Sequence, residues 1–331
     1  MASSACSSED SRHAIDALLR SCGLAAERVR SVARVYCDIH RITPTRGGGD
    51  VALRVYPAER TDARPVEAEI AWLRALADAG LHVPRPISDG EGRFLHRWQP
   101  DPARPPRHAV LLTWLDGRMH DRGLTPERLR RVGVMTAQLH RVSARLARDG
   151  AFATDRRALD CDLHAWAGET RARALGAEGA AAARAAALRL ADELARLPTS
   201  ADGHGFVHGD LHQWNLLFAG DVAGAIDFSD CGWGHHALDL AAPLQFLRHR
   251  LTDQHDHRPH AARLQDALLR GYASVAALPA DVERQIDAYV VARMFMSMDW
   301  ILDDWPHAGY RPWRAKFMRG CAQALRAYAG A

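Results

Sequence analysis

The sequence lacks several residue patterns that would identify a class of protein. Only one of its 43 basic residues is a lysine, Lys316, so arginine carries almost all of the positive charge. The six cysteines are scattered without a Cys-x-x-Cys pair, which favours free thiols over a zinc site or a disulfide framework. No run approaches the roughly 18 apolar residues of a membrane span, and the first residues show no signal-peptide pattern. We therefore expect a cytoplasmic protein with no membrane partner.

The charge composition gives no reason to expect a nucleic-acid partner. The 43 basic and 40 acidic residues are interleaved, the formal net charge is +3, and there is no basic tail or stripe. Hydrophobic residues make up 47% of 331, enough for a sizeable core and, at about 150 residues per domain, for two domains or one large one. The sequence does not indicate an oligomeric state.

The apolar pattern divides the chain into a mixed first third and a helical remainder. The first third is predicted to contain two helices, over residues 13–30 and 67–81, and three strands, over residues 32–42, 50–56 and 108–117. The turn Gly47–Gly49 joins the first two of these strands. Long amphipathic helices follow from Leu124, interrupted by one non-helical segment over residues 205–234 that contains a predicted hairpin.

This non-helical segment concentrates residues suited to phosphoryl transfer. Asp210 can orient an attacking hydroxyl and accept its proton, whereas Asn215 and Asp227 can supply oxygen ligands to Mg²⁺. Asn215 follows Asp210 by five residues, which is the spacing of the kinase catalytic loop. A single loop aspartate is usually a turn or capping residue. Several such residues in this order instead predict a catalytic site with a metal.

The segment H-G-D-L-H-x-x-N-L-L-F, followed by A-I-D-F-S-D and D-L-A, resembles the aminoglycoside phosphotransferase and choline kinase superfamily. The resemblance implies an α+β, bilobal protein-kinase-like fold. Residues 1–113 would form a nucleotide-binding N-lobe with a small mixed sheet, and residues 114–331 a mostly helical C-lobe with the catalytic loop and acceptor pocket. The resemblance also implies the following roles: catalytic base for Asp210, loop support for His208, Mg²⁺ ligation for Asn215 and Asp227, and a structural role for Asp239.

The resemblance extends to V-A-L-R-V-Y and the helix after it. Kinases carry a lysine on this strand, but here Arg54 is the only cation available to contact the α- and β-phosphates, with Glu69 or Glu67 as its helix partner. Arginine can bind phosphate bidentately, although it is bulkier and less mobile than lysine. The alternative is an exposed strand arginine paired with a surface carboxylate.

Two further nucleotide contacts follow from the resemblance. The segment L-L-T-W-L-D-G is similar to the hinge between the lobes, so backbone groups of Thr113, Trp114 and Leu115 are expected to hydrogen-bond a purine edge. Trp114 could instead serve only in packing. No G-x-G-x-x-G motif is present, and a shorter loop at residues 35–38 is expected to cover the phosphates.

The residues that bind the acceptor are the part of the site about which the sequence says least. Asp299, Asp303 and Asp304 lie among aromatic residues and would suit a cationic hydroxylated substrate, although helix capping or a solvated surface is the alternative. We therefore expect a Mg²⁺-dependent kinase that transfers the γ-phosphate of ATP or GTP to a small-molecule hydroxyl, on an aminoglycoside, amino alcohol, amino acid or sugar. The alternatives are a Ser/Thr protein kinase of the bacterial stress-response type and a nucleotide-binding pseudokinase, the latter because Arg54 replaces lysine.

Overall fold

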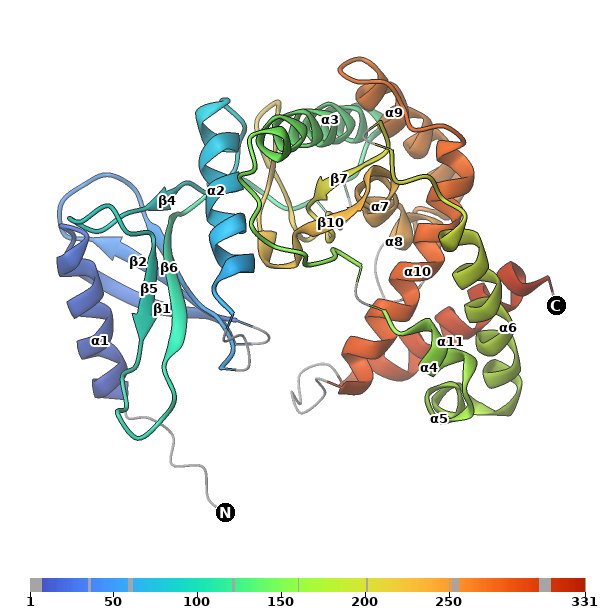
Figure 1. The fold of residues 1–331 in the computed structure, drawn as a ribbon, viewed down its shortest axis with the longest axis horizontal. Helices are drawn as coiled ribbons and strands as arrows, with labels where there is room; N and C mark the ends of the chain where they lie inside the picture. Colours follow the sequence, from blue (N-terminus) through green and yellow to red (C-terminus); the bar gives the residue numbers. More distant parts are fainter. Residues whose placement is uncertain are drawn as a thin grey trace. The chain divides into compact units, whose positions relative to one another are not determined.

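The structure is a computed structural model, and it forms two compact units (Figure 1). Unit 1 comprises Met1–Asp116 with Ala151–Thr154, and unit 2 comprises Gly117–Gly150 with Asp155–Ala331. The structure describes the following residues: 8–34, 37–58, 62–120, 123–159, 161–200, 202–249, 251, 256–303 and 311–330. No helix in these ranges is long and apolar enough to cross a membrane.

Unit 1 is built on a six-stranded antiparallel sheet. The strand order is β1-β2-β3-β6-β4, and β5 also pairs with β6. The strands are β1 (Ala26–Arg34), β2 (Asp38–Pro44), β3 (Val51–Val55), β4 (Pro86–Ile87), β5 (Leu95–Trp98) and β6 (Arg107–Thr113).

The predicted helix over residues 13–30 and strand over residues 32–42 are wrong in their bounds. Helix α1 (Ser8–Ser21) stops early because Gly23, at φ +70°, lets the Leu24 N–H donate back to the Leu19 carbonyl at 2.8 Å. Strand β1 then starts at Ala26 and is followed by β2, so the predicted single strand consists of the end of β1 and most of β2.

Helices α1 and α2 (Arg64–Asp78) lie on opposite sides of this sheet (Figure 1). On the α1 side, Ile15 and Leu19 share a buried core with Leu53 and Val55 of β3. Because successive side chains of a strand point to opposite faces, Arg54 between them points away from that core. The alternation of β3 thus directs Arg54 toward the sheet face that α2 covers.

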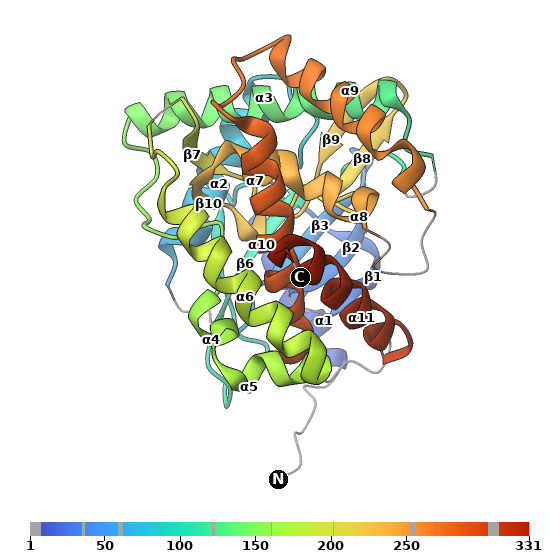
Figure 2. The same ribbon diagram turned by 90° about the vertical axis from the view of Figure 1, so that its right-hand side faces the viewer.

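Unit 2 is mostly helical. Its helices are α3 (Pro126–Arg148), α4 (Leu163–Ala167), α5 (Glu169–Ala172), α6 (Gly176–Ala195), α7 (His236–Ala241), α8 (Gln245–Arg248), α9 (Ala261–Ala273), α10 (Val282–Asp303) and α11 (Arg311–Ala329). Short 3₁₀ turns lie at Arg173–Leu175, Phe228–Asp230, Ala242–Leu244 and Arg258–His260. Helix α3 packs against α9, and α6 packs against α11 (Figure 2).

The non-helical segment of unit 2 forms two small antiparallel pairs. Strands β7 (His204–Val207) and β10 (Gly232–His235) pair with each other, and β8 (Leu216–Ala219) and β9 (Val222–Ala225) form the predicted hairpin. The chain between β7 and β8 contains Asp210 and Asn215, and the chain between β9 and β10 contains Asp227. The two pairs therefore position the residues that the sequence singled out.

Candidate active site

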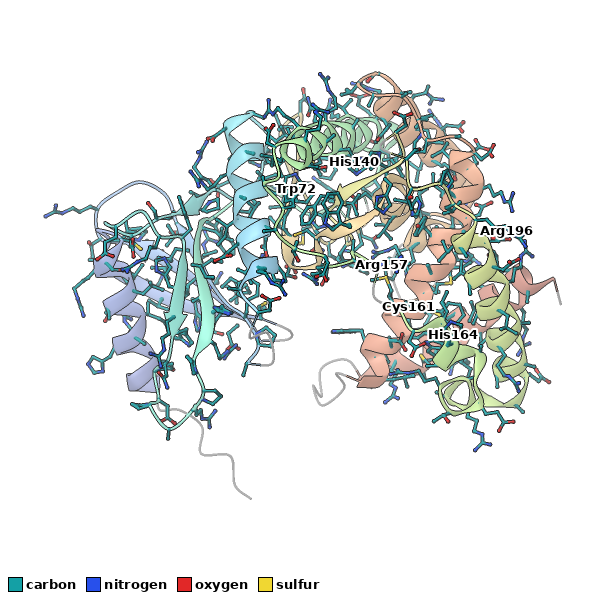
Figure 3. The ribbon with its side chains drawn as sticks, viewed as in Figure 1. Trp72, His140, Arg157, Cys161, His164 and Arg196 are labelled. Carbon is teal, nitrogen blue, oxygen red and sulfur yellow. The ribbon has the colours of Figure 1, made fainter. Side chains whose placement is uncertain are left out.

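The loop between β7 and β8 is held through its backbone by Asp239 of α7. The Asp239 carboxylate accepts hydrogen bonds from the N–H groups of His208 at 2.9 Å and Gly209 at 2.8 Å. It also accepts one at 3.0 Å from Nε2 of His140, a residue of α3 that is labelled in Figure 3. Burial alone would raise the pKa of Asp239, but these hydrogen bonds and the nearby histidines hold it below its usual value. Asp239 is thus a buried carboxylate that fixes the loop.

Gly209 permits the turn that this loop makes. Its φ is +83°, and a Cβ atom added to it would lie 2.7 Å from the backbone oxygen of Asp230. A side chain would therefore meet both backbone strain and a steric clash. This explains why the motif places glycine between His208 and Asp210.

His208 connects the loop to the segment that carries Asp227. Its side chain is fully buried, Nδ1 accepts from the Asp210 N–H at 3.2 Å, and Nε2 donates to the Ile226 carbonyl at 3.1 Å. Ile226 also donates its N–H to the Asn215 carbonyl at 3.0 Å. These bonds bring Asp210, Asn215 and Asp227 into one neighbourhood within unit 2.

The Asp210 carboxylate is held at both oxygens. Oδ1 accepts from Arg293 of α10 at 2.6 Å, and Oδ2 accepts from Asn215 Nδ2 at 3.0 Å. His212 Nε2 lies 3.4 Å from Oδ2. Burial would raise the pKa of Asp210, but the neighbouring His212 and Arg293 hold it below its usual value. Asp210 is therefore an ionised, oriented carboxylate that can accept a hydrogen bond from a hydroxyl.

Asn215 and Asp227 have the donor atoms that a hard cation requires. Asn215 uses Nδ2 toward the backbone oxygen and the carboxylate of Asp210, which leaves its Oδ1 for a cation. Asp227 adopts a left-handed backbone at φ 63°, and Ser229 donates to its Oδ1 at 3.0 Å. No group of three His, Cys, Asp or Glu residues in the described ranges could hold a metal alone. The two residues fit Mg²⁺, which usually retains waters and phosphate oxygens as ligands.

Arg54 of unit 1 pairs with Glu69 and not with Glu67. Arg54 NH1 lies 2.6 Å from Glu69 Oε1, and Tyr56 donates its hydroxyl to Glu69 Oε2 at 2.7 Å. Glu69 lies on the buried face of α2, whereas Glu67 is exposed. Because Arg54 is only 6% exposed, the alternative of a surface ion pair does not hold.

The three hinge positions differ in what they can offer a ligand. Thr113 and Trp114 donate their N–H groups within unit 1, to the carbonyls of Arg85 and Asp50 respectively, both at 2.9 Å. The Arg41 guanidinium lies over the Trp114 ring, with its Cζ atom 4.4 Å from the ring centroid. Leu115 donates its N–H to no backbone group of the described residues. Of the three N–H groups, that of Leu115 is therefore the one open to a nucleobase.

Of the predicted substrate residues, Asp299 is the one whose side chain lies within the described residues. Its Oδ1 accepts from Trp166 Nε1 at 2.8 Å and pairs with Arg171 at 2.7 Å, and Cys161 lies 3.7 Å from Oδ2 (Figure 3). Asp299 is therefore already neutralised by an arginine of unit 2. The side chain of Asp303, together with Asp304, lies outside the described residues, as do residues 35 and 36 of the predicted phosphate loop.

Sequence reasoning missed three residues that hold the site: Arg293, Tyr56 and His140. The sequence did contain an indication that Arg293 is important, since it is the one charged residue in the run Y-V-V-A-R-M-F-M-S-M. A buried charge in an apolar run requires partners. Nothing local in the sequence indicates the contacts of Tyr56 or His140.

Comparison with known proteins shows the family and the fold of this chain. Residues 38–278, more than half of the chain, match the model of the phosphotransferase enzyme family. A microcompartment-associated aminopropanol kinase is 25% identical over 92% of this chain and 91% of its own, with a TM-score of 0.73. No curated protein matches.

Two further solved structures share the fold at lower identity. An amicoumacin kinase in complex with AMP-PNP and Ca²⁺ is 18% identical, with 96% of each chain covered and a TM-score of 0.72. A spectinomycin phosphotransferase in complex with ADP is 12% identical over 96% of this chain and 98% of its own, with a TM-score of 0.62. The predicted superfamily and protein-kinase-like α+β fold are thereby confirmed. The chain belongs to the phosphotransferase enzyme family and is a small-molecule phosphotransferase that acts on hydroxyl groups.

Proposed function

We propose that the protein uses Mg²⁺ and transfers the γ-phosphate of ATP or GTP to a small-molecule hydroxyl in the cytoplasm. The observation that carries the proposal is the Asp210 carboxylate, ionised and held by Arg293 and Asn215 on a loop that Asp239 fixes. Such an arrangement suits phosphoryl transfer, in which catalysis is mainly positioning and charge stabilisation.

In the proposed reaction Asp210 orients the acceptor hydroxyl. The hydroxyl oxygen forms a bond to the γ-phosphorus, the bond from that phosphorus to the β–γ bridging oxygen breaks, and the acceptor proton passes to Asp210. The nucleoside diphosphate leaves with the electron pair of the broken bond. Asn215 and Asp227 would bind Mg²⁺, which supplies positive charge to the phosphates when bound.

Residues of unit 1 would hold the nucleotide. Arg54 would contact the α- and β-phosphates, with Glu69 orienting its guanidinium. Leu115, whose N–H has no backbone partner in the described ranges, would bind the purine edge. In this proposal residues 1–113 form the nucleotide-binding lobe and residues 114–331 the lobe that binds the acceptor.

An amino alcohol is the acceptor class that we place first. The 25% identity to an aminopropanol kinase supports it. The pairing of Asp299 with Arg171 points the same way, because a polycationic acceptor would have to displace the arginine to use this carboxylate. A small acceptor with one ammonium group needs fewer carboxylate partners, so it has less need to displace Arg171 from Asp299. Aminoglycosides, amino acids and sugars remain acceptor classes to be tested.

The test is Mg²⁺-dependent transfer from radiolabelled ATP and GTP to amino alcohols, aminoglycosides, amino acids and sugars. Asp210→Asn should abolish transfer while the fold is kept. Asp266→Asn is the matched control, because this exposed carboxylate on α9 lies apart from the loop, and it should retain full activity. Absence of transfer from wild type to every small acceptor, or labelling of protein substrates instead, would overturn the proposal.

A further inference from the structure

A buried arginine lies beside the proposed catalytic base. Arg293 is 3% exposed and occupies the middle of α10, between apolar neighbours on both sides. Burying a guanidinium among apolar side chains is costly unless its donors find acceptors. The contacts of Arg293 therefore indicate why the chain keeps a charge at this position.

Each nitrogen of the Arg293 guanidinium donates to a different group. NH1 donates to the backbone oxygen of Gly209 at 2.6 Å, and NH2 donates to Asp210 Oδ1, also at 2.6 Å. Nε donates to Gln245 Oε1 of α8 at 3.1 Å. A planar fork with three engaged nitrogens has little freedom to rotate, so it defines the positions of its acceptors.

Gln245 holds the guanidinium at Nε, the nitrogen that does not contact the loop. The Gln245 side chain is fully buried, and its Nε2 donates to Ser297 Oγ at 3.2 Å. Ser297 in turn donates to the backbone oxygen of Arg293 at 2.8 Å. The arginine is therefore braced from α8 and from its own helix.

The peptide between Gly209 and Asp210 is consequently fixed at both of its polar groups. Arg293 binds its carbonyl oxygen, and His208 Nδ1 accepts from its N–H at 3.2 Å. The same arginine also binds the carboxylate of Asp210. One side chain thus constrains both the backbone that carries the proposed base and the orientation of its carboxylate.

We propose that Arg293 is a positioning residue for phosphoryl transfer, which acts through Asp210 and makes no contact with the substrate. The proposal rests on the role of Asp210 in the proposed function. A lysine could not fully replace Arg293, because an ammonium lacks the planar fork that reaches the Gly209 carbonyl, the Asp210 carboxylate and the Gln245 amide together. Misplacement of a reacting group by about 1 Å costs roughly 100-fold in rate.

The kinetic test compares Arg293→Gln and Arg293→Lys with wild type. We expect kcat to fall by about 100-fold in Arg293→Gln and by less in Arg293→Lys, with the nucleotide KM unchanged within about twofold. Arg270→Gln, on the exposed surface of α9, is the matched control and should keep the wild-type kcat. A kcat per folded molecule equal to wild type in both Arg293 variants would show a merely structural role and overturn the proposal. If Arg293→Gln does not fold, Arg293→Lys alone decides.

A second arm requires no acceptor. Amide hydrogen exchange of residues 208–215 is measured in wild type and in both Arg293 variants, with α6 as an internal reference. We expect faster exchange in the loop and unchanged exchange in α6, and loop protection equal to wild type would overturn the positioning role. If wild type transfers no phosphate, the proposed function fails while this arm still tests whether Arg293 holds the loop.

Discussion

Arg54 and Glu69 form an ion pair of 2.6 Å in which neither side chain is more than 7% exposed. Glu69 has a second buried partner, because the Tyr56 hydroxyl donates to its other oxygen. Burial and the neighbouring carboxylate raise the pKa of Tyr56 well above its usual value, so its hydroxyl remains a donor. Arg54, which is predicted to take the place of the usual lysine, is thus part of a buried network with Glu69 and Tyr56.

Replacement of Arg54 by methionine should destabilise the protein strongly, because Glu69 would remain as an unpaired buried charge. We expect a loss of about 3 to 5 kcal/mol in the free energy of unfolding, measured by urea denaturation without nucleotide. Arg12→Met removes an exposed pair with Asp16 in the same unit and should cost less than about 1 kcal/mol. Equal effects of the two variants would contradict the buried network.

Removal of the Tyr56 hydroxyl tests the other half of the network. Tyr56→Phe keeps the ring but withdraws one donor from the Glu69 carboxylate. A hydrogen bond to a charged group contributes about 1.5 to 3 kcal/mol, so urea denaturation should show a loss of that size. We also expect weaker nucleotide binding, measured by calorimetry, because Glu69 would orient Arg54 less well. Unchanged stability and affinity would argue against this role.

Gly209→Ala should abolish phosphoryl transfer, because its Cβ would lie 2.7 Å from the Asp230 carbonyl oxygen and would displace the loop. Gly220→Ala is the matched control: Gly220 also has a positive φ, +58°, but a Cβ there meets nothing within 4 Å. We expect the control to cost only about 1 kcal/mol of stability and to keep its activity. Transfer assays and thermal unfolding distinguish the two. Activity in Gly209→Ala would show that the loop tolerates the shift.

His236 should make stability depend on pH. Burial, together with the nearby His140, lowers the pKa of His236 to about 2 from a usual 6.5. The unfolded chain therefore binds a proton below about pH 6.5 that the folded protein does not, so stability falls as the pH drops from there. One proton bound only by the unfolded chain lowers the free energy of unfolding by about 1.4 kcal/mol for each pH unit below that value.

The measurement is the free energy of unfolding by urea between about pH 7 and pH 5. His236→Gln removes the titrating group and should show a shallower dependence on pH than wild type. His13→Gln is the control on α1, where the side chain is exposed, and it should leave the slope unchanged. If the free energy of unfolding of wild type and of His236→Gln depended on pH with the same slope, His236 would not contribute to the pH dependence of stability.

The proximity of Asp210 and Asn215 on one loop could be predicted from the sequence because it is a local property. Asp210 and Asn215 lie five residues apart, so one short loop brings them together whatever the surroundings, and the Asn215–Asp210 hydrogen bond follows. The β8–β9 hairpin was predictable for the same reason, from two apolar runs and a turn. The early helix was predicted too long because its end depends on the Gly23 turn, which periodicity alone does not mark.

Contacts between distant segments depended on the tertiary structure. The sequence left both Glu67 and Glu69 as partners for Arg54, and the packing of α2 decided for Glu69 by turning only that side chain inward. It suggested Asp299 for the substrate, whereas the structure pairs this carboxylate with Arg171, 128 residues away in the chain.

The sequence by itself determined the order of the proposed catalytic residues, because motif spacing is a local property, and the resemblance of these motifs implied the family and the fold class. Only the tertiary structure decided how Asp210 is held. Arg293, 83 residues away, reaches it because α10 packs beside the loop, and no pattern of neighbouring residues encodes that approach. Burial then makes the contact consequential, since a guanidinium and a carboxylate removed from water must satisfy each other.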